Sequence, residues 1–127
     1  MTAFDEVIEV EPGRRAVAAR HVTHTLGVFA THFPRFPVLP GVLILDDLVG
    51  AARLAAPEPP PGTRWKPVRV RRVRYRHFAC PGDRLVFTAT VTEDAGDAVT
   101  VRAVASVGPR DVTTVRELRL AAVEVAA

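Results

Sequence analysis

Apolar and polar residues alternate along most of this chain, and the alternation stops at residues typical of turns. It runs over residues 4–9, stops at Pro12-Gly13 and resumes over residues 14–25. Because successive side chains of a strand point to opposite faces, alternation predicts a strand that is buried on one face only. The two alternating runs and the turn between them therefore predict a β-hairpin.

The next regular segment has a different pattern. Residues 40–56 are apolar on nearly every side of a helical wheel and contain no helix breaker apart from Gly50. A helix that is apolar all round is a buried helix, so we expect most of its sides to be wrapped by sheet. Residues 57–62 contain too many prolines for a helix or a central strand, which predicts a stiff connector.

Alternation returns after this connector. It predicts long strands over residues 64–78, 84–93 and 98–107, with turns at Pro81-Gly82-Asp83 and at residues 94–97. Residues 108–110 lead into a last strand that ends near Val125. One long helix followed by a run of antiparallel strands predicts an α+β fold in which an antiparallel sheet wraps around one central helix. We expect residues 1–127 to form one domain.

The segment before the helix contains candidate acid/base chemistry. His32 lies in a loop that is stiffened by Pro34, Pro37 and Pro40. A neutral imidazole, with a reference pKa near ~6.5, can remove a proton from the carbon next to a thioester carbonyl if that carbonyl is polarised. Amide groups at Gly41 and Val42, at the helix N-terminus, can polarise it.

Asp46 is the candidate acid. It follows Val42, Leu43, Ile44 and Leu45 in the apolar segment. Burial among these side chains should raise its pKa and keep the carboxyl protonated. A protonated carboxyl can give its proton to a leaving hydroxyl group. His32 and Asp46 therefore predict a pair of groups suited to elimination of water.

The run His-Phe-Pro-x-x-Pro-x-x-Pro-Gly-Val-Leu-Ile-Leu-Asp, from His32 to Asp46, resembles the signature of the 3-hydroxyacyl-[acyl-carrier-protein] dehydratases of fatty-acid and polyketide synthesis. Residues 4–13 and 73–85 also resemble parts of that family. The resemblance implies the hotdog fold and a lyase that converts 3-hydroxyacyl thioesters to trans-2-enoyl thioesters. It further implies an acyl carrier protein as partner and no cofactor.

The resemblance also assigns roles to residues. It implies that His32 is the base, that Asp46 is the acid, that the Gly41 amide binds the thioester oxygen and that the Val38 carbonyl orients the second ring nitrogen of His32. In that family the histidine and the acid come from different subunits, which implies a homodimer or higher oligomer with shared active sites.

Two positions depart from the family pattern. Most of these dehydratases have glutamate at the position of Asp46, and aspartate is typical of a sister branch that also isomerises the new double bond. Gly50 stands where the family usually has glutamine. The missing glutamine keeps open the alternative of a non-catalytic hotdog subunit that binds acyl carrier protein or an active partner. An acyl thioesterase is a further alternative, since other hotdog proteins hydrolyse thioesters.

Basic residues are concentrated in one predicted strand. The chain has 17 basic and 14 acidic residues, with a net charge of +3. The alternation changes phase at Arg71-Arg72, which predicts a β-bulge. A solvated strand face and a docking site for an acidic carrier protein explain the cluster equally well. The small net charge and the few aromatic rings disfavour nucleic acid as a ligand. The proposed docking residues are Arg69, Arg71, Arg72, Arg74 and Arg76.

Other residues limit the location and the chemistry. No apolar run approaches the ~20 residues of a membrane helix, and the first residues are acidic rather than basic, so we expect a cytoplasmic protein with no secretory signal. Cys80 is the only cysteine, which fits a reducing compartment.

Six more side chains receive minor roles. His21, His24 and His77 have no carboxylate or cysteine at metal-ligand spacing, so we expect strand or surface residues there and no metal site. Asp47 is expected to be a solvent or interface charge. Arg53 lies on the Asp46 side of the helix, and Tyr75 is expected to pack in the core or border an acyl pocket.

Overall fold

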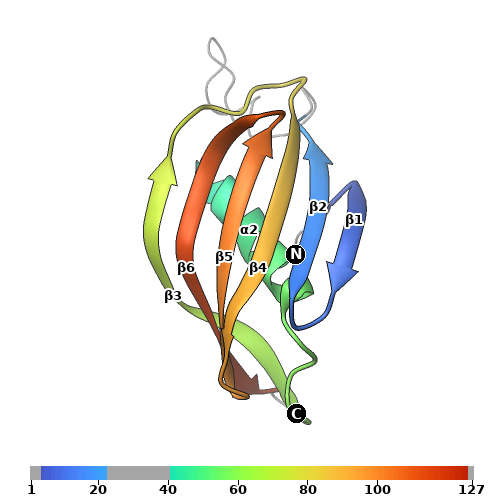
Figure 1. The fold of residues 1–127 in the computed structure, drawn as a ribbon, viewed down its shortest axis with the longest axis vertical. Helices are drawn as coiled ribbons and strands as arrows, with labels where there is room; N and C mark the ends of the chain where they lie inside the picture. The colour runs from blue at the N-terminus through green and yellow to red at the C-terminus, as the bar shows by residue number, and fades with distance from the viewer. Residues whose placement is uncertain (1–3, 23–40, 126–127) are drawn as a thin grey trace.

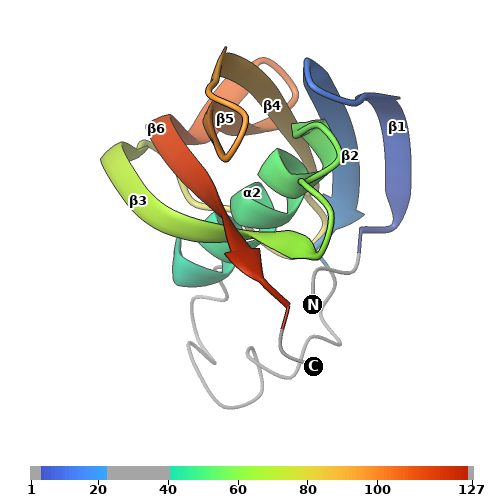
Figure 2. The same cartoon turned by 90° about the horizontal axis from the view of Figure 1, so that it is seen from below.

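A six-stranded antiparallel sheet curves around one helix. The computed structural model describes residues 4–22 and 41–125. The elements are β1 (Glu6–Glu11), β2 (Arg15–His21), α2 (Gly41–Ala55), β3 (Thr63–Tyr75), β4 (Arg84–Asp94), β5 (Ala98–Val107) and β6 (Arg110–Glu124). The strands lie in the order β1-β2-β4-β5-β6-β3, and α2 lies against the concave face of the sheet (Figures 1 and 2). The predicted α+β architecture is therefore confirmed.

Small residues on one side of α2 let the helix lie close to the sheet. Ala51, Ala52 and Ala55 are 0% exposed and pack into the same core as Phe87 and Leu118. Each large apolar side chain that is fully buried stabilises the fold by about 1.5–3 kcal/mol. This core holds the helix against β4, β5 and β6.

The opposite side of α2 is not covered by the sheet. Val42 is 68% exposed and Leu43 is 40% exposed. The exposed residues of α2, Val42, Leu43, Asp46 and Arg53, all lie on this one side, so the prediction that the sheet wraps most sides of the helix is confirmed. An apolar residue on every side of a helix does not show which sides a single chain covers, because apolar surface can also be covered by another subunit.

Within the described residues, the predicted strands and turns are confirmed with small differences in their ends; residues 23–25 of the predicted second strand lie outside the described residues. Gly13 and Gly82, in two of the predicted turns, have φ angles of 83° and 97°, which favour glycine. The proline-rich connector forms neither helix nor strand, and the indole Nε1 of Trp65 donates a hydrogen bond of 2.7 Å to the Pro57 carbonyl oxygen. This bond fastens the connector to the start of β3.

The predicted bulge at Arg71-Arg72 is not where β3 and β6 lose register. Their register shifts between Pro67 and Arg69, and it continues unchanged past Arg71 and Val73. Arg72 nevertheless has a left-handed φ of 57°. The alternation of buried and exposed residues changes phase in β6 as well, since Val115 and Leu118 are three positions apart and both buried. β3 and β6 therefore stay in register here, and the register shift lies between β6 and β5, between Val101 and Ala103.

Candidate active site

A pocket opens at the N-terminus of α2. Its volume is about 820 Å³. Three elements form its wall: the first turn of α2, the end of β3 with the residues that follow it, and the start of β6. The lining residues are Gly41, Val42, Ile44, Tyr75, Arg76, His77, Phe78, Cys80, Asp83, Arg110 and Thr113. The two predicted substrate-binding residues that the structure describes, Gly41 and Val42, are both among them.

The ring of Tyr75 packs against Gly41. A Cβ atom at position 41 would lie 2.7 Å from Cε1 of Tyr75, which is closer than atoms pack in folded proteins. A side chain at position 41 would therefore displace this ring. Tyr75 is 56% exposed and borders the pocket, as one of its two predicted roles requires.

The predicted catalytic pair is only half described. His32 and Val38 lie outside the described residues. Asp46 lies in the second turn of α2, where its side chain is exposed and does not line the pocket of its own chain. The prediction that Asp46 is buried among apolar neighbours is therefore wrong for the single chain. The reason is that Val42 and Leu43, which precede it by one turn, are themselves exposed.

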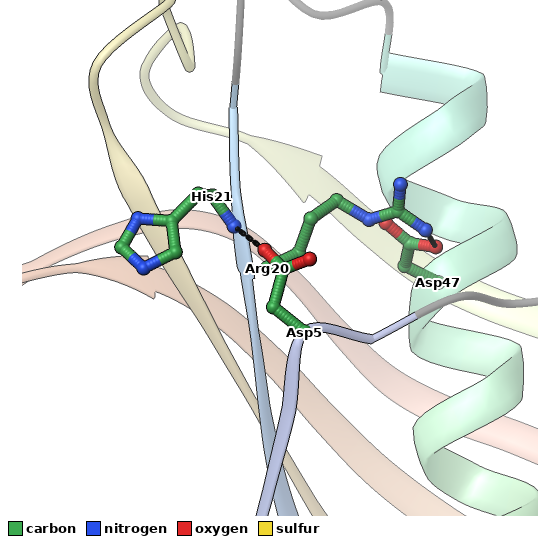
Figure 3. Close-up of polar contacts among 4 residues, drawn as sticks. All are labelled: Asp5, Arg20, His21 and Asp47. Atoms are coloured by element: carbon green, nitrogen blue, oxygen red, sulfur yellow. Dashed lines mark hydrogen bonds and ion pairs between the residues drawn. The ribbon is translucent and has the colours of Figure 1, made fainter.

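The buried carboxylate of α2 is Asp47. It is 4% exposed, and its Oδ1 accepts a hydrogen bond of 2.9 Å from Nη2 of Arg20 on β2 (Figure 3). Burial raises the pKa of Asp47 from its ordinary value, and the charge and hydrogen bond of Arg20 oppose this shift without cancelling it. The prediction of a solvent or interface charge is wrong. Asp47 follows Ile44 by three positions and precedes Leu48, both buried, so it shares their side of the helix.

Two other contacts fix the elements around this pair. Asp5 accepts a hydrogen bond from the backbone amide of His21 (Figure 3), which ties the chain before β1 to the end of β2. Arg53 does not reach Asp46; its Nε donates to the Trp65 carbonyl oxygen at 3.2 Å. Arg53 therefore joins α2 to β3.

His77 is a pocket residue that the sequence analysis treated as a strand or surface residue. It follows the end of β3, is exposed and lines the pocket with Arg76. The sequence did not signal this role, because the alternation placed His77 within the predicted strand over residues 64–78, whereas β3 ends at Tyr75. Within residues 4–22 and 41–125, no group of three or more histidine, cysteine or acidic side chains is placed to hold a metal ion. None of the helices in these ranges has the length and apolar character needed to cross a membrane.

A second groove lies on the outer face of the sheet. Its volume is about 560 Å³, and β3, β5 and β6 form it. Five arginines line it: Arg72, Arg74, Arg76, Arg102 and Arg116. Arg76 lines both this groove and the pocket at the helix N-terminus. The two cavities are therefore neighbours.

Known proteins resemble this chain in sequence. The family model of the ApeI-like proteins, described as ApeI dehydratase, matches residues 9–108. The 3-hydroxyacyl-[acyl-carrier-protein] dehydratases FabZ of Burkholderia mallei and Burkholderia pseudomallei are 37% identical to it over 91 residues. The match covers 68% of this chain and 59% of each relative. The chain thus spans less than two thirds of the curated relatives it matches.

Solved structures resemble the chain in fold. A hot-dog-like protein from Thermanaerovibrio acidaminovorans superposes with a TM-score of 0.73 at 20% identity, covering 91% of this chain and 85% of that one. The dehydratase heterocomplex ApeI:P of Xenorhabdus doucetiae gives a TM-score of 0.66 at 23% identity, covering 91% and 96%. These structural likenesses confirm the hotdog fold. The match to the family model identifies the family within that fold. The chain belongs to the ApeI-like dehydratase family.

Proposed function

We propose that this protein is a lyase that removes water from 3-hydroxyacyl thioesters carried by an acyl carrier protein and forms trans-2-enoyl thioesters. Fatty-acid or polyketide biosynthesis is the setting that the resemblance implies. The observation that carries the proposal is the pocket at the first turn of α2, which Gly41 and Val42 line. Both residues belong to the motif that begins at His32. The match to the dehydratase family supports the choice of reaction.

The proposed reaction assigns one step to each residue. His32 takes the proton from C2 of the substrate, and the Val38 carbonyl holds the second ring nitrogen of His32. The electron pair of the C2–H bond forms the C2–C3 double bond as the C3–O bond breaks. Asp46 gives its proton to the departing hydroxyl, which leaves as water. The Gly41 and Val42 amides, at the positive end of the α2 dipole, stabilise the charge that develops on the thioester oxygen.

The exposed position of Asp46 supports an active site shared between subunits. Asp46 does not line the pocket of its own chain, and Val42 and Leu43 expose apolar surface one turn before it. A partner that covered this side of α2 would bury that surface and bring Asp46 to a second pocket. We therefore place His32 and Asp46 of one site on different subunits of a homodimer or larger assembly.

The arginines of β3 are the proposed docking site for the carrier. Arg69, Arg71, Arg72, Arg74 and Arg76 are exposed. A concentrated positive surface next to the pocket would attract an acidic carrier and speed its association. The single cysteine, Cys80, fits a reducing compartment, and we place the protein in the cytoplasm.

Turnover of a defined substrate tests the proposal. Purified protein incubated with a 3-hydroxyacyl carrier thioester should form a product lighter by one water, as measured by mass spectrometry. His32→Ala and Asp46→Asn should each abolish this product. Asp97→Asn changes an exposed carboxylate in the turn between β4 and β5 and is the matched control, so it should leave turnover unchanged. An unaffected rate in His32→Ala would sink the assignment, and release of free thiol would point to thioester hydrolysis.

Mixing the two inactive variants tests the shared site. Random reassociation into dimers makes half of them mixed, and each mixed dimer has one intact site, so about a quarter of the wild-type activity should return. The mixture should be unfolded and refolded together to allow exchange. No recovery from a properly refolded mixture would place both groups in one chain.

A non-catalytic subunit is the second candidate, and Gly50 favours it. This position usually holds glutamine in the dehydratases, whereas here it is a buried glycine with no side chain to hydrogen-bond Asp46. The heterocomplex architecture of the ApeI:P relative fits such a role. Detectable turnover by the isolated protein would reject this candidate.

A further inference from the structure

The five arginines of the outer groove form one cluster across three strands. Thr114 of β6 pairs with Arg74 of β3 on one side and with Val104 of β5 on the other. One step further along the strands, Val115 pairs with Val73 and Ala103. Arg72 adjoins Val73 in β3, Arg116 adjoins Val115 in β6 and Arg102 adjoins Ala103 in β5. Three arginines therefore lie side by side on neighbouring strands.

This cluster lacks the acidic partners that a sheet normally supplies. Like charges on neighbouring strands destabilise a sheet. Among the described residues, none of the five arginines forms an ion pair, although Asp111 lines the same groove. By contrast, Arg71 on the same strand lies 3.7 Å from Glu117. The groove therefore retains a positive charge that a bound anion would neutralise.

The backbone at Arg72 adds a second, independent observation. Its φ of 57° is the only positive φ of a non-glycine residue in the described chain. Such a conformation is strained for a residue with a Cβ atom, and strain of this kind is concentrated at binding sites. Arg72 lines the groove beside Arg74.

We propose that the arginine groove binds the phosphate group at the far end of the pantetheine arm of the thioester substrate. Arg76 lines both the groove and the pocket at the helix N-terminus, so a thioester in the pocket can extend its arm toward the groove. Guanidinium groups bind phosphate oxygens through paired, charge-assisted hydrogen bonds. This inference rests on the proposed function, because it assumes that the pocket receives the thioester.

Thioester substrates that carry different phosphates test the inference. The pantetheine thioester has no phosphate, the 4′-phosphopantetheine thioester differs from it by one phosphate only, the coenzyme A thioester has three, and the carrier thioester has one phosphodiester on a protein. The variant is Arg102→Gln with Arg116→Gln, two groove residues on β5 and β6 that lie outside the β3 docking strand. Arg64→Gln is the control, because Arg64 is an exposed arginine of β3 outside the groove.

The double variant should lower kcat/KM about tenfold or more for every phosphate-bearing substrate, through a higher KM. Its kcat/KM for the pantetheine thioester should stay within about twofold of the wild-type value, and Arg64→Gln should change none of the four. An equal loss for the substrate without phosphate would overturn the inference. A loss confined to the carrier thioester would overturn it too, because it would identify a protein-docking surface. Failure of the wild type on all four substrates would instead refute the proposed function.

Discussion

Removing Arg20 should destabilise the protein by stranding a buried carboxylate. Arg20 Nη2 lies 2.9 Å from Asp47 Oδ1, and the side chains of Arg20 and Asp47 are 20% and 6% exposed. Loss of one partner from a fully buried pair costs about 3–5 kcal/mol. Because Arg20 retains some contact with water and Asp47 can take up a proton, we expect the lower end, about 3 kcal/mol at pH 7, for Arg20→Met. This is a large share of the roughly 5–15 kcal/mol by which domains are stable.

The pH dependence identifies the charge as the cause. Burial raises the folded pKa of Asp47 above its unfolded value. An acid of this kind contributes stability that is present below the unfolded pKa, about 3.9, and is lost as pH rises through the folded pKa. Arg20→Met removes an interaction that lowers this pKa, so the folded pKa rises further. Relative to the wild type, Arg20→Met should therefore lose less free energy of unfolding at pH 5 than at pH 7. This difference in stability grows by about 1.4 kcal/mol for each pH unit between the folded pKa of Asp47 in the wild type and its higher folded pKa in the variant.

Urea unfolding of four proteins at pH 5 and pH 7 measures these effects. The double variant Arg20→Met with Asp47→Leu removes both charges, so it should lie within about 1 kcal/mol of the wild type. Arg84→Met is the matched control: it breaks a pair of similar length, 3.0 Å, whose side chains are 43% and 57% exposed. It should cost no more than about 1 kcal/mol. An Arg20→Met deficit that is equal at both pH values, or a double variant less stable than Arg20→Met, would refute the reasoning.

Three further changes give distinct expected outcomes. Gly41→Ala should lower Tm, because the new methyl group would displace the Tyr75 ring 2.7 Å away, and adding Tyr75→Ala should remove that loss; an undiminished loss in the pair would exclude the ring as its cause. Phe87→Ala should cost about 3–5 kcal/mol in urea unfolding, since Phe87 is 0% exposed; a cost below about 1 kcal/mol would mean that the core collapses around the gap. Val42→Lys with Leu43→Lys should convert the proposed dimer to monomer in light scattering while the far-UV circular dichroism spectrum stays unchanged, and an intact dimer would exclude this side of α2 as the interface.

The periodicity of the sequence was sufficient to predict the fold because each element has a single dominant pattern. Alternation gave the strands, proline and glycine marked their ends, and the apolar run after Pro40 gave the helix. Local patterns of this kind depend only on neighbouring residues. They do not depend on which strands pair, so they can be recognised without knowledge of the tertiary structure.

The burial of the two aspartates could not be predicted from the same pattern. Asp46 and Asp47 both lie in a segment with apolar residues on nearly every side, so either side of the helix was a candidate for the core. The side that faces the sheet contains Asp47, together with the alanines that let the helix approach. Its partner Arg20 lies 27 residues earlier, across a segment whose path the sequence does not specify.

The outer groove depends on strand register in the same way. The arginines of β3 are adjacent in sequence and were found as a cluster. Arg102 and Arg116 lie on two other strands, and they join the cluster only because β6 lies between β5 and β3 in the observed order. The phase change at Arg71-Arg72 pointed to the region, but pairing decides which arginines meet.

The Arg20–Asp47 pair links the two parts of the chain that flank the proposed base. Arg20 lies at the end of β2, and Asp47 lies in α2 beside Asp46; residues 23–40, which include His32, connect these elements. Asp5 holds the end of β2 as well, through the amide of His21. Both points at which residues 23–40 join the described chain are therefore fastened to the same core. The buried pair costs stability, and in the proposed mechanism it would help to position the catalytic base, His32.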